Sequence, residues 1–217
     1  MMHKRPYLIR RYYPSDRFNH WFVAITFILV ALSGLALFHP AFFFLSHLLG
    51  GGPWTRILHP FIGVVMFVAF LVLAFRFWGD NFFTGKDRQW IRQMDDVVSN
   101  REEKLPPVGR YNAGQKLFFW TMVTSILLLL ISGILIWQPY FAPYVPIIVI
   151  RVAVLVHALS AFVAITGLIV HIYAAIWVKG SVEAMTRGTV TGAWARQHHL
   201  DWYRKMKNGE IRGHDHY

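Results

Sequence analysis

Residues 146–180 read PIIVIRVAVLVHALSAFVAITGLIVHIYAAIWVKG, and this stretch decides the fold of the chain. Between Ile148 and Val178 it holds no acidic residue, and Arg151 and Lys179 are its only full charges, one near each end. A helix rises about 1.5 Å per residue, and the hydrocarbon core of a bilayer is about 30 Å thick. The stretch therefore predicts a membrane-spanning helix.

Two histidines interrupt this apolar stretch, His157 and His171. Their spacing is nearly four helical turns, so both imidazoles point the same way and lie about 21 Å apart along the axis. Counted back from Lys179, His171 lies about 12 Å and His157 about 33 Å from that end, which places one histidine in each leaflet. Ionisable groups inside a membrane are rare and mostly functional. Two on one face predict two cofactors stacked across a bilayer.

The composition places the chain among membrane proteins. Of its 217 residues, 55% are hydrophobic and 15% are charged, against about 25% charged in soluble domains. Cysteine is absent, which excludes disulfides, thiolate-held iron–sulfur clusters, c-type haem attachment and a cysteine nucleophile in this chain. Any redox cofactor would therefore be held by histidine. The basic segment Met1–Arg17 lacks a small-residue cleavage site after its apolar run, so we expect an uncleaved first span.

Hydropathy and charge predict the topology. Four apolar segments are long enough to cross a membrane: residues 18–38, 54–78, 115–137 and 148–178. Lys and Arg gather in the N-terminal segment, in the loop 79–114 and in the tail 179–217, whereas the connections His39–Pro53 and Gln138–Ile150 carry none. The positive-inside rule then places both termini and the middle loop in the cytoplasm. We expect a single all-α integral membrane domain, a four-transmembrane-helix bundle, and no nucleic-acid partner.

The segments between the spans carry further expectations. Residues 87–100, DRQWIRQMDDVVSN, place apolar side chains on one face, which predicts an amphipathic helix on the cytoplasmic surface. The apolar segment 41–52, AFFFLSHLLGGG, is expected in the outer membrane interface, with His39 and His47 as loop residues. The tail stretch 192–206 is expected to be helical. We expect the tail histidines to be solvated: His198, His199, His214 and His216.

Depth sorts the remaining histidines into two pairs. His20, at the start of the first span, shares the inner leaflet with His171, and His59 shares the outer leaflet with His157. Neutral imidazole is a good axial ligand of haem iron, and two histidines on opposite sides leave no position for oxygen or substrate. The pairs therefore predict two electron-transfer haems. Zinc would require three or four ligands at one depth.

The predicted spans also contain four glycines and one repeated sequence pattern. A macrocycle could approach the helix backbone at four glycines, although glycine at helix–helix contacts explains them equally: Gly34, Gly63, Gly133 and Gly167. SGLALFHP at residues 33–40 resembles SGILIWQP at residues 132–139, a faint internal duplication or shared composition that carries no functional claim by itself.

Seven motifs spread along nearly the whole chain are specific enough to compare with known families: DRFNHW (16–21), RILHPFIG (56–63), GRYNAGQK (109–116), LVHA (155–158), IVHIY (169–173), WVKGS (177–181) and HHLDWYR (198–204). In these motifs the chain resembles the membrane cytochrome b (gamma) subunits of respiratory formate dehydrogenases. The resemblance implies two b-type haems in four spans. It assigns the outer haem to His59 and His157 and the inner haem to His20 and His171, the same pairing that depth gives.

The resemblance also implies a quinone site beside the inner haem, at the positions of Asn112, Gly114, Gln115 and His171. The residues themselves offer another interpretation. Asn112 three residues before Gln115, at a helix start, is a capping-box pattern in which both side chains satisfy backbone donors. Both roles are compatible, because Gly114 would leave backbone N–H groups open to a quinone oxygen at the positive end of the helix.

From the resemblance, the expected function is that of a dihaem electron-transfer subunit in a bacterial inner membrane. Electrons from formate, oxidised in a catalytic alpha subunit, would arrive through an iron–sulfur beta subunit at the outer face. They would leave on menaquinone or ubiquinone at the cytoplasmic side. The chain has no catalytic triad or phosphate loop, so the dehydrogenase activity belongs to the complex, with quinone reduction at this subunit. Further expected contacts are membrane lipid and other copies of the complex.

Two alternatives remain open at this point. A cytochrome b subunit of a nickel–iron hydrogenase or of thiosulfate reductase would share the four-span, histidine-ligated design. A haem-free transporter could use His157 and His171 as a proton relay. The lack of an intramembrane Asp or Glu counts against the transporter.

Overall fold

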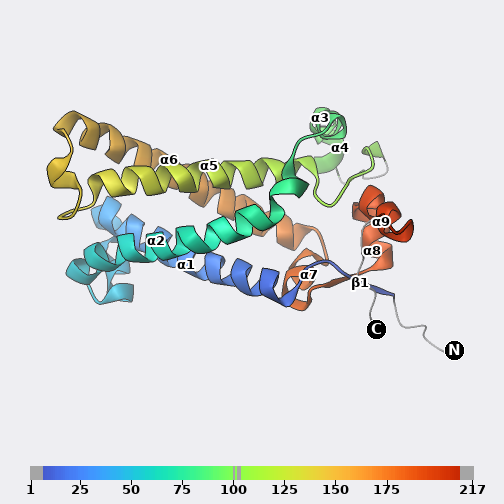
Figure 1. Cartoon of the computed structure of the whole chain (residues 1–217), viewed down its shortest axis with the longest axis horizontal. Coiled ribbons are helices and arrows are strands. Elements are labelled where there is room, and N and C mark those ends of the chain that lie inside the picture. The colour runs from blue at the N-terminus through green and yellow to red at the C-terminus, as the bar shows by residue number, and fades with distance from the viewer. Residues whose placement is uncertain (1–6, 100, 102–103, 211–217) are drawn as a thin grey trace. The chain divides into compact units, whose positions relative to one another are not determined.

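A computed structural model describes residues 7–99, 101 and 104–210, and helices predominate in these ranges (Figure 1). The chain divides into two compact units. We call residues 18–76 and 121–171 the apolar unit, and residues 1–17, 77–120 and 172–217 the polar unit. His214 and His216, expected to be solvated, lie outside the described residues, as does Asn100 at the end of the expected amphipathic helix.

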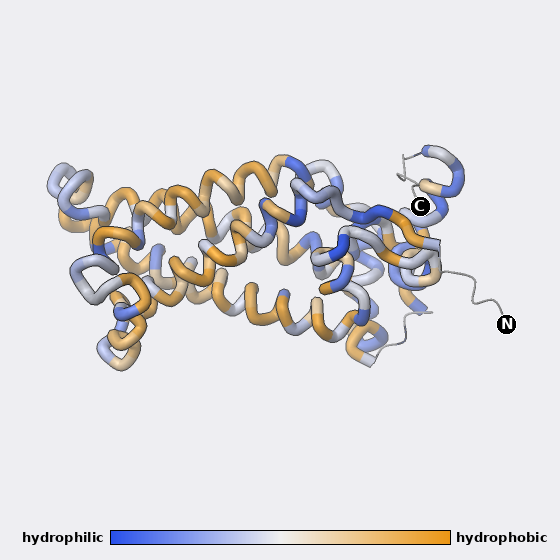
Figure 2. The backbone as a smooth tube through the Cα atoms, turned by 90° about the horizontal axis from the view of Figure 1, so that it is seen from below, coloured by the Kyte–Doolittle hydropathy of each residue, from blue (hydrophilic) through white to orange (hydrophobic). Residues whose placement is uncertain are grey.

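Four helices in the described ranges are long and apolar enough to cross a membrane, as the sequence predicts. They are α1 (Pro14–Phe38), α2 (Gly52–Phe77), α5 (Ala113–Ile136) and α6 (Ile147–Trp177). Their 24 to 31 residues correspond to about 36 to 47 Å of helix, enough for a hydrocarbon core of about 30 Å. Hydrophobic residues dominate along all four (Figure 2). Their bounds differ from the expected ones by a few residues.

The surface of these helices suits lipid. Large apolar side chains are exposed along α6, including Leu159, Phe162 and Ile169. The buried residues of α6 are small, namely Ala153, Ser160 and Ala164. Small residues allow helix backbones to approach closely, which is how membrane helices pack in the absence of a hydrophobic driving force.

The segment after α1 is a 3₁₀ helix, Pro40–Leu49. His39 precedes it, and its Nδ1 accepts a hydrogen bond from the backbone N–H of Ala41 (3.1 Å). Gly50 ends the helix with a φ of 89°, a left-handed conformation that favours glycine. The expected apolar interface segment is therefore helical, and His39 caps it. A second 3₁₀ turn, Ala142–Tyr144, lies between α5 and α6.

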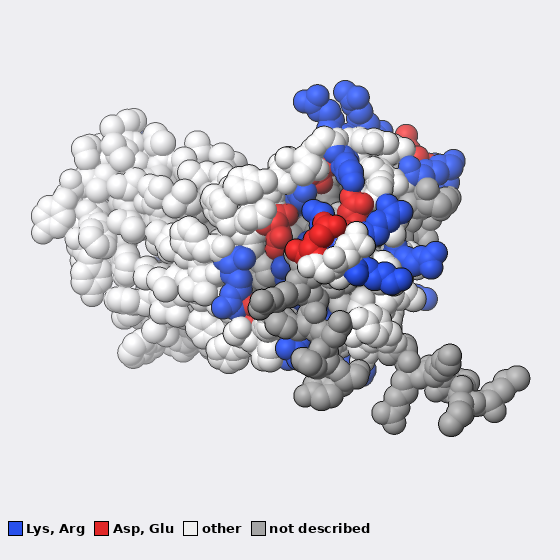
Figure 3. Space-filling view, turned by 45° about the vertical axis from the view of Figure 1, so that its right-hand side comes forward, with Lys and Arg blue, Asp and Glu red and all other residues white. Residues whose placement is uncertain are grey.

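The polar unit joins the N-terminal segment to the tail. Strand β1 (Leu8–Arg10) pairs antiparallel with β2 (Thr189–Thr191) in the two-stranded sheet found among the described residues. Two short helices flank β2, namely α7 (Ser181–Arg187) and α8 (Gly192–His198), and α9 (Leu200–Lys207) packs on α8. A core of buried side chains holds the strands and helices together: Ile9, Tyr12, Ala184, Val190, Ala195 and Trp202. Basic and acidic side chains lie interspersed on the surface of this unit (Figure 3).

The connection between α2 and α5 begins with a 3₁₀ turn, Trp78–Asn81, and continues as α3 (Gly85–Arg92) and α4 (Met94–Val98). One continuous amphipathic helix was expected here, and that expectation was wrong. Gln93, with φ −100° and ψ 30°, leaves helical geometry and separates the two helices. Of the apolar residues expected on one face, Trp90 is buried, whereas Ile91, Met94 and Val98 are exposed.

The expectation that His199 is solvated was also wrong, because its side chain is only 3% exposed. Its Nδ1 lies 2.8 Å from the carbonyl of Gly109, and its Nε2 lies 3.2 Å from an Arg11 guanidinium nitrogen. A carbonyl only accepts and a guanidinium only donates, so His199 is the neutral imidazole with its proton on Nδ1. Burial, the Arg11 charge and His198 hold the pKa of His199 well below its usual value.

Arg11 is itself buried, and aromatic rings surround its guanidinium. Its Cζ lies 5.0 Å from the ring centres of Trp194 and Trp202. Cation–π contact of this kind stabilises a buried guanidinium. The neutral His199 thus accepts a hydrogen bond from a cation that links the N-terminal segment to α8 and α9.

Acidification should loosen this junction. The folded-state pKa of His199 lies below the unfolded-state value of about 6.5, so the unfolded chain binds more protons below that pH. The contribution of neutral His199 to the free energy of unfolding of the polar unit is therefore fully present above about pH 6.5, and it declines as the pH falls below that value. This decline can be measured by hydrogen exchange of the β1 and α9 amides between pH 7.5 and 5.5, after correction for the intrinsic exchange rates. His199→Gln should flatten the dependence, and equal slopes would contradict the assignment.

Candidate functional site

The apolar unit brings the four intramembrane histidines together in two facing pairs. His59 of α2 faces His157 of α6, with ring centroids 6.4 Å apart and ring planes at 65°. His20 of α1 faces His171 of α6, with centroids 6.3 Å apart and planes at 51°. These are the two pairs that the depth argument predicts, and α6 supplies one member of each.

The spacing of each pair fits one metal ion between two imidazoles. A metal–imidazole bond of about 2.0 Å on each side, plus about 1.2 Å from each ring nitrogen to its centroid, gives a centroid separation of about 6.4 Å. Within residues 7–99, 101 and 104–210, no group of three or more His, Asp or Glu could hold a metal ion. Two opposed imidazoles suit haem iron, whose equatorial ligands come from the macrocycle.

The two pairs differ in what lies next to the Nδ1 atoms of their imidazoles. The Nδ1 of His59 lies 2.8 Å from the hydroxyl of Ser33, and the Nδ1 of His157 lies 3.0 Å from the hydroxyl of Ser132. The Nδ1 of His20 is buried and has no hydrogen-bond partner in the part of the chain that the structure describes. Buried polar atoms are nearly always paired, so this nitrogen sets the His20 ring apart from the two rings that a serine contacts.

Sequence reasoning missed both serines as site residues. The signal was present in the repeated Ser–Gly of residues 33–34 and 132–133, which we noted without assigning a function. The glycines also have a role other than the expected approach of a macrocycle. A Cβ on Gly34 would lie 3.2 Å from His59 Cε1, and a Cβ on Gly133 would lie 3.3 Å from His157 Cε1. Both glycines therefore make room for an imidazole.

The start of α5 carries the residues expected at a quinone site, and it forms the capping box. The backbone N–H of Gln115 donates to Asn112 Oδ1 (2.9 Å), and the backbone N–H of Asn112 donates to Gln115 Oε1 (3.0 Å). The structural half of the sequence interpretation is thus confirmed. Because both side-chain oxygens bind backbone N–H groups, their amide NH₂ groups are left as donors. Quinone binding there stays a prediction.

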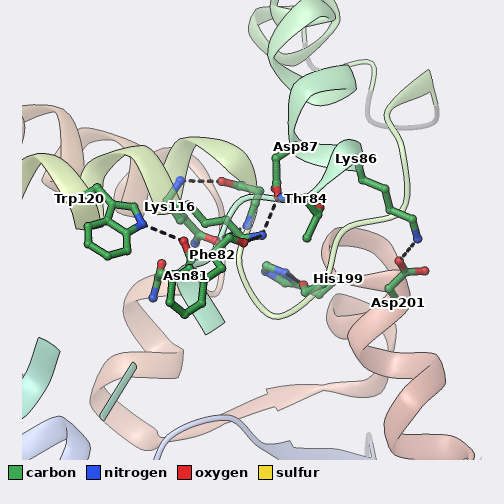
Figure 4. Close-up of polar contacts among 12 residues, drawn as sticks. Asn81, Phe82, Thr84, Lys86, Asp87, Lys116, Trp120, His199 and Asp201 are labelled. Atoms are coloured by element: carbon green, nitrogen blue, oxygen red, sulfur yellow. Dashed lines mark hydrogen bonds and ion pairs between the residues drawn. The ribbon is translucent and has the colours of Figure 1, made fainter. Parts of the chain in front are cut away.

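Helix α3 packs on this end of α5. A Cβ on Gly114 would lie 3.3 Å from the ring of Trp90, so glycine lets the tryptophan pack closely on this turn of α5. One residue beyond the capping box, Lys116 donates to Asp87 Oδ2 (2.8 Å) and to the carbonyl of Phe82 (3.0 Å). Figure 4 shows Lys116 reaching from α5 to these two groups.

The Lys116–Asp87 ion pair is buried, with both side chains 8% exposed. Burial alone would raise the pKa of Asp87, but hydrogen bonds from Lys116 and Thr84 outweigh it and hold the pKa of Asp87 below its usual value. A fully bonded pair of this kind fixes α3 against the first turn of α5. The residues that carry the capping box therefore stand on a rigid support.

Two further histidines on this side of the chain were expected to be loop residues. His39 binds the backbone of the 3₁₀ helix that follows it, whereas His47 lies within that helix and is exposed, so the expectation was wrong for His47. The structure pairs His59 with His157, and neither His39 nor His47 takes part in that pair.

Comparison with known proteins places these features in a family. Residues 11–188 match the family described as prokaryotic cytochrome b561. The chain is 46% identical over 204 residues to the formate dehydrogenase cytochrome b556(fdo) subunit of Escherichia coli K12, covering 94% of this chain and 96% of the relative. It is 42% identical over 197 residues to the nitrate-inducible cytochrome b556(Fdn) subunit of the same strain, covering 91% of each. A formate dehydrogenase cytochrome b556 subunit of Haemophilus influenzae is 41% identical over 198 residues, covering 91% of this chain and 83% of the relative.

Removing Lys116 should release α3. In Lys116→Met the carboxylate of Asp87 stays buried without its cation, which typically costs about 3–5 kcal/mol. Hydrogen exchange of the α3 amides measures the local opening free energy. Lys86→Met is the matched control, because the neighbouring Lys86–Asp201 pair is exposed on its lysine side and should contribute at most about 1 kcal/mol. Equal exchange in the two variants would contradict a supporting role for the buried pair.

Proposed function

The chain belongs to the prokaryotic cytochrome b561 family and to the formate dehydrogenase cytochrome b556 subunits, and we propose that it carries electrons across a membrane from formate oxidation to a quinone. This proposal rests on the two pairs of facing imidazoles, each with a spacing that fits one haem iron. The relatives favour formate dehydrogenase over the hydrogenase, thiosulfate reductase and transporter alternatives that the sequence left open.

Two b-type haems would be held, one by His59 and His157 and one by His20 and His171. When bound, haem iron supplies reversible one-electron chemistry. The two histidines of each pair would hold one haem iron between them and would leave no position on it for oxygen or substrate. The serine hydroxyls orient one pair, and α6 fixes the distance between the pairs because His157 and His171 lie nearly four turns apart on it.

The orientation that we propose rests on charge. Basic residues fill the polar unit, whereas the connections 39–53 and 138–150 carry no Lys or Arg. This pattern supports a bacterial inner membrane location with both termini in the cytoplasm. The His59–His157 pair then lies toward the outer face, where an iron–sulfur beta subunit and a catalytic alpha subunit would deliver electrons. The enzyme activity is that of the complex.

Quinone is proposed to bind at the amino end of α5. The capping box turns the amide NH₂ groups of Asn112 and Gln115 away from the backbone that their oxygens bind. The backbone N–H groups of Ala113 and Gly114 belong to the first helical turn, which has no intrahelical acceptors. Together these donors would stabilise negative charge on a quinone oxygen as it is reduced. A contribution from His171, which the resemblance implies, stays a prediction.

Loss of one ligand should remove one haem. In His157→Ala we expect pyridine haemochrome to fall from two haems per chain to one, with the haem at His20 and His171 still reduced by quinol. His47→Ala is the control, because this exposed histidine contacts neither pair and should leave both haems. If His157→Ala retains two haems, the pairing is wrong.

Replacing an amide by a carboxylate separates helix capping from quinone binding. Asn112→Asp and Gln115→Glu keep the oxygens that cap α5 but remove the amide donors, so stability should stay within about 0.5 kcal/mol of the parent while quinone turnover falls. Asn112→Ala removes both functions and should also cost about 1 kcal/mol of stability. Steady-state quinone reduction and affinity for a quinone-analogue inhibitor, with both haems verified, measure the effect. Unchanged turnover in Asn112→Asp and Gln115→Glu would leave these residues as caps only.

A further inference from the structure

We propose that Ser33 and Ser132 are positioning residues that fix the tautomer of His59 and His157 and thereby lower the redox potential of the centre these histidines hold. This inference rests on the proposed function, because it takes the pair as axial ligands. It goes beyond that function by naming what makes one centre chemically different from the other.

The Ser33 hydroxyl, together with the backbone of Val30 that also bonds the ring, directs where the proton of His59 lies. Its Oγ is 3.0 Å from the carbonyl of Val30 in the same helix and 2.8 Å from His59 Nδ1. A carbonyl can only accept, so the hydroxyl proton goes to Val30 and the oxygen offers a lone pair to the ring. His59 Nδ1 must therefore donate, and its proton is on Nδ1. Nε2 is left with the free lone pair that a metal ligand needs.

Ser132 repeats this arrangement on the other side of the pair. Its Oγ lies 2.6 Å from the carbonyl of Leu128 and 3.0 Å from His157 Nδ1. The same reasoning puts the proton of His157 on Nδ1 and frees its Nε2. In both cases the serine and the histidine come from different helices, α1 to α2 and α5 to α6. Both imidazoles of the pair are thus prepared for ligation before any metal binds.

The glycine after each serine restrains the ring. A Cβ at Gly34 or Gly133 would come within 3.2 or 3.3 Å of the Cε1 atom of the facing histidine. The Cε1 atom lies between the two ring nitrogens, so the ring edge rests on the helix backbone beside the hydroxyl that binds it. A hydrogen bond and a close backbone contact together limit rotation of each ring. Ser–Gly is therefore a two-residue support for a ligand histidine, and the chain uses it twice.

The other pair lacks this support at one ligand at least. The Nδ1 of His20 is buried and finds no hydrogen-bond partner among the described residues. An Nδ1–H that donates to an oxygen makes the imidazole a stronger electron donor, which favours the more positive oxidation state of the metal. The two serines therefore lower the potential of the His59–His157 centre relative to the other. Electrons that enter at this pair would then move downhill toward His20 and His171.

The test uses the purified complex with Ser33→Ala/Ser132→Ala, and the control is Thr26→Val/Ser125→Ala. Thr26 and Ser125 lie one heptad before the two serines on the same helices, and the Thr26 hydroxyl bonds the backbone of its own helix. Haem content, a potentiometric titration of each haem and the low-temperature EPR spectrum are measured. The EPR spectrum reports the relative orientation of the axial imidazoles.

We expect the serine variant to retain two haems. The oxidised-to-reduced equilibrium of the His59–His157 centre should change about tenfold toward the reduced form. A tenfold change is the low end of the effects caused by removing a group that hydrogen-bonds to a metal ligand. For a one-electron couple this is an upward shift of about 59 mV. The EPR signal of the same centre should broaden, because the rings lose their anchor. The other haem and the control variant should match the parent.

A serine variant whose potentials equal those of the control, or one in which both haems shift together, would overturn the inference. If the double variant does not keep the haem, Ser33→Ala and Ser132→Ala are titrated singly. Each should show part of the upward shift, and two unshifted single variants would overturn the inference as well. Failure of the proposed function looks different, because the parent complex would then lack two haems or His157→Ala would keep both.

Discussion

Helix α6 presents two imidazoles on one face, and each is opposed by a histidine of another helix; the rest of the apolar unit depends on this constraint. A polar atom of an imidazole inside a membrane costs several kcal/mol when it is left unpaired. Helix α6 places two such groups on one face, and this face must therefore meet helices that carry matching groups. Helices α1 and α2 meet it through His20 and His59.

The sequence predicted what depends on local periodicity. Helical rise and hydropathy are read from neighbouring residues, so the four long helices, the two histidine pairs and the capping box at Asn112 were all foreseeable. Contacts between residues far apart in the chain were not. His199 binds Gly109 and Arg11, and β1 pairs with a strand about 180 residues later, so no local pattern marks either. The polarity of His199 predicted exposure to solvent, whereas its neutral ring is buried and has a partner on each nitrogen.

The serines show a third case, in which the pattern was visible but its meaning was not. A repeated Ser–Gly in two apolar helices is expected from helix packing alone, because small residues are common at such contacts. Only the facing imidazole reveals that the hydroxyl accepts from Nδ1 and that the glycine admits the ring edge. A short polar residue in a membrane helix thus acquires a chemical role from the helix opposite.

This arrangement bears on how one helix can hold two similar centres that differ in potential. His157 and His171 share a helix and a face, so their ligand type cannot separate the two centres. The difference has to come from atoms beyond the ring, and Ser132 and Ser33 supply it at one pair while the Nδ1 of His20 remains without a partner among the described residues. Two hydroxyls placed by a repeated two-residue motif are then enough to give a symmetric ligand set a direction.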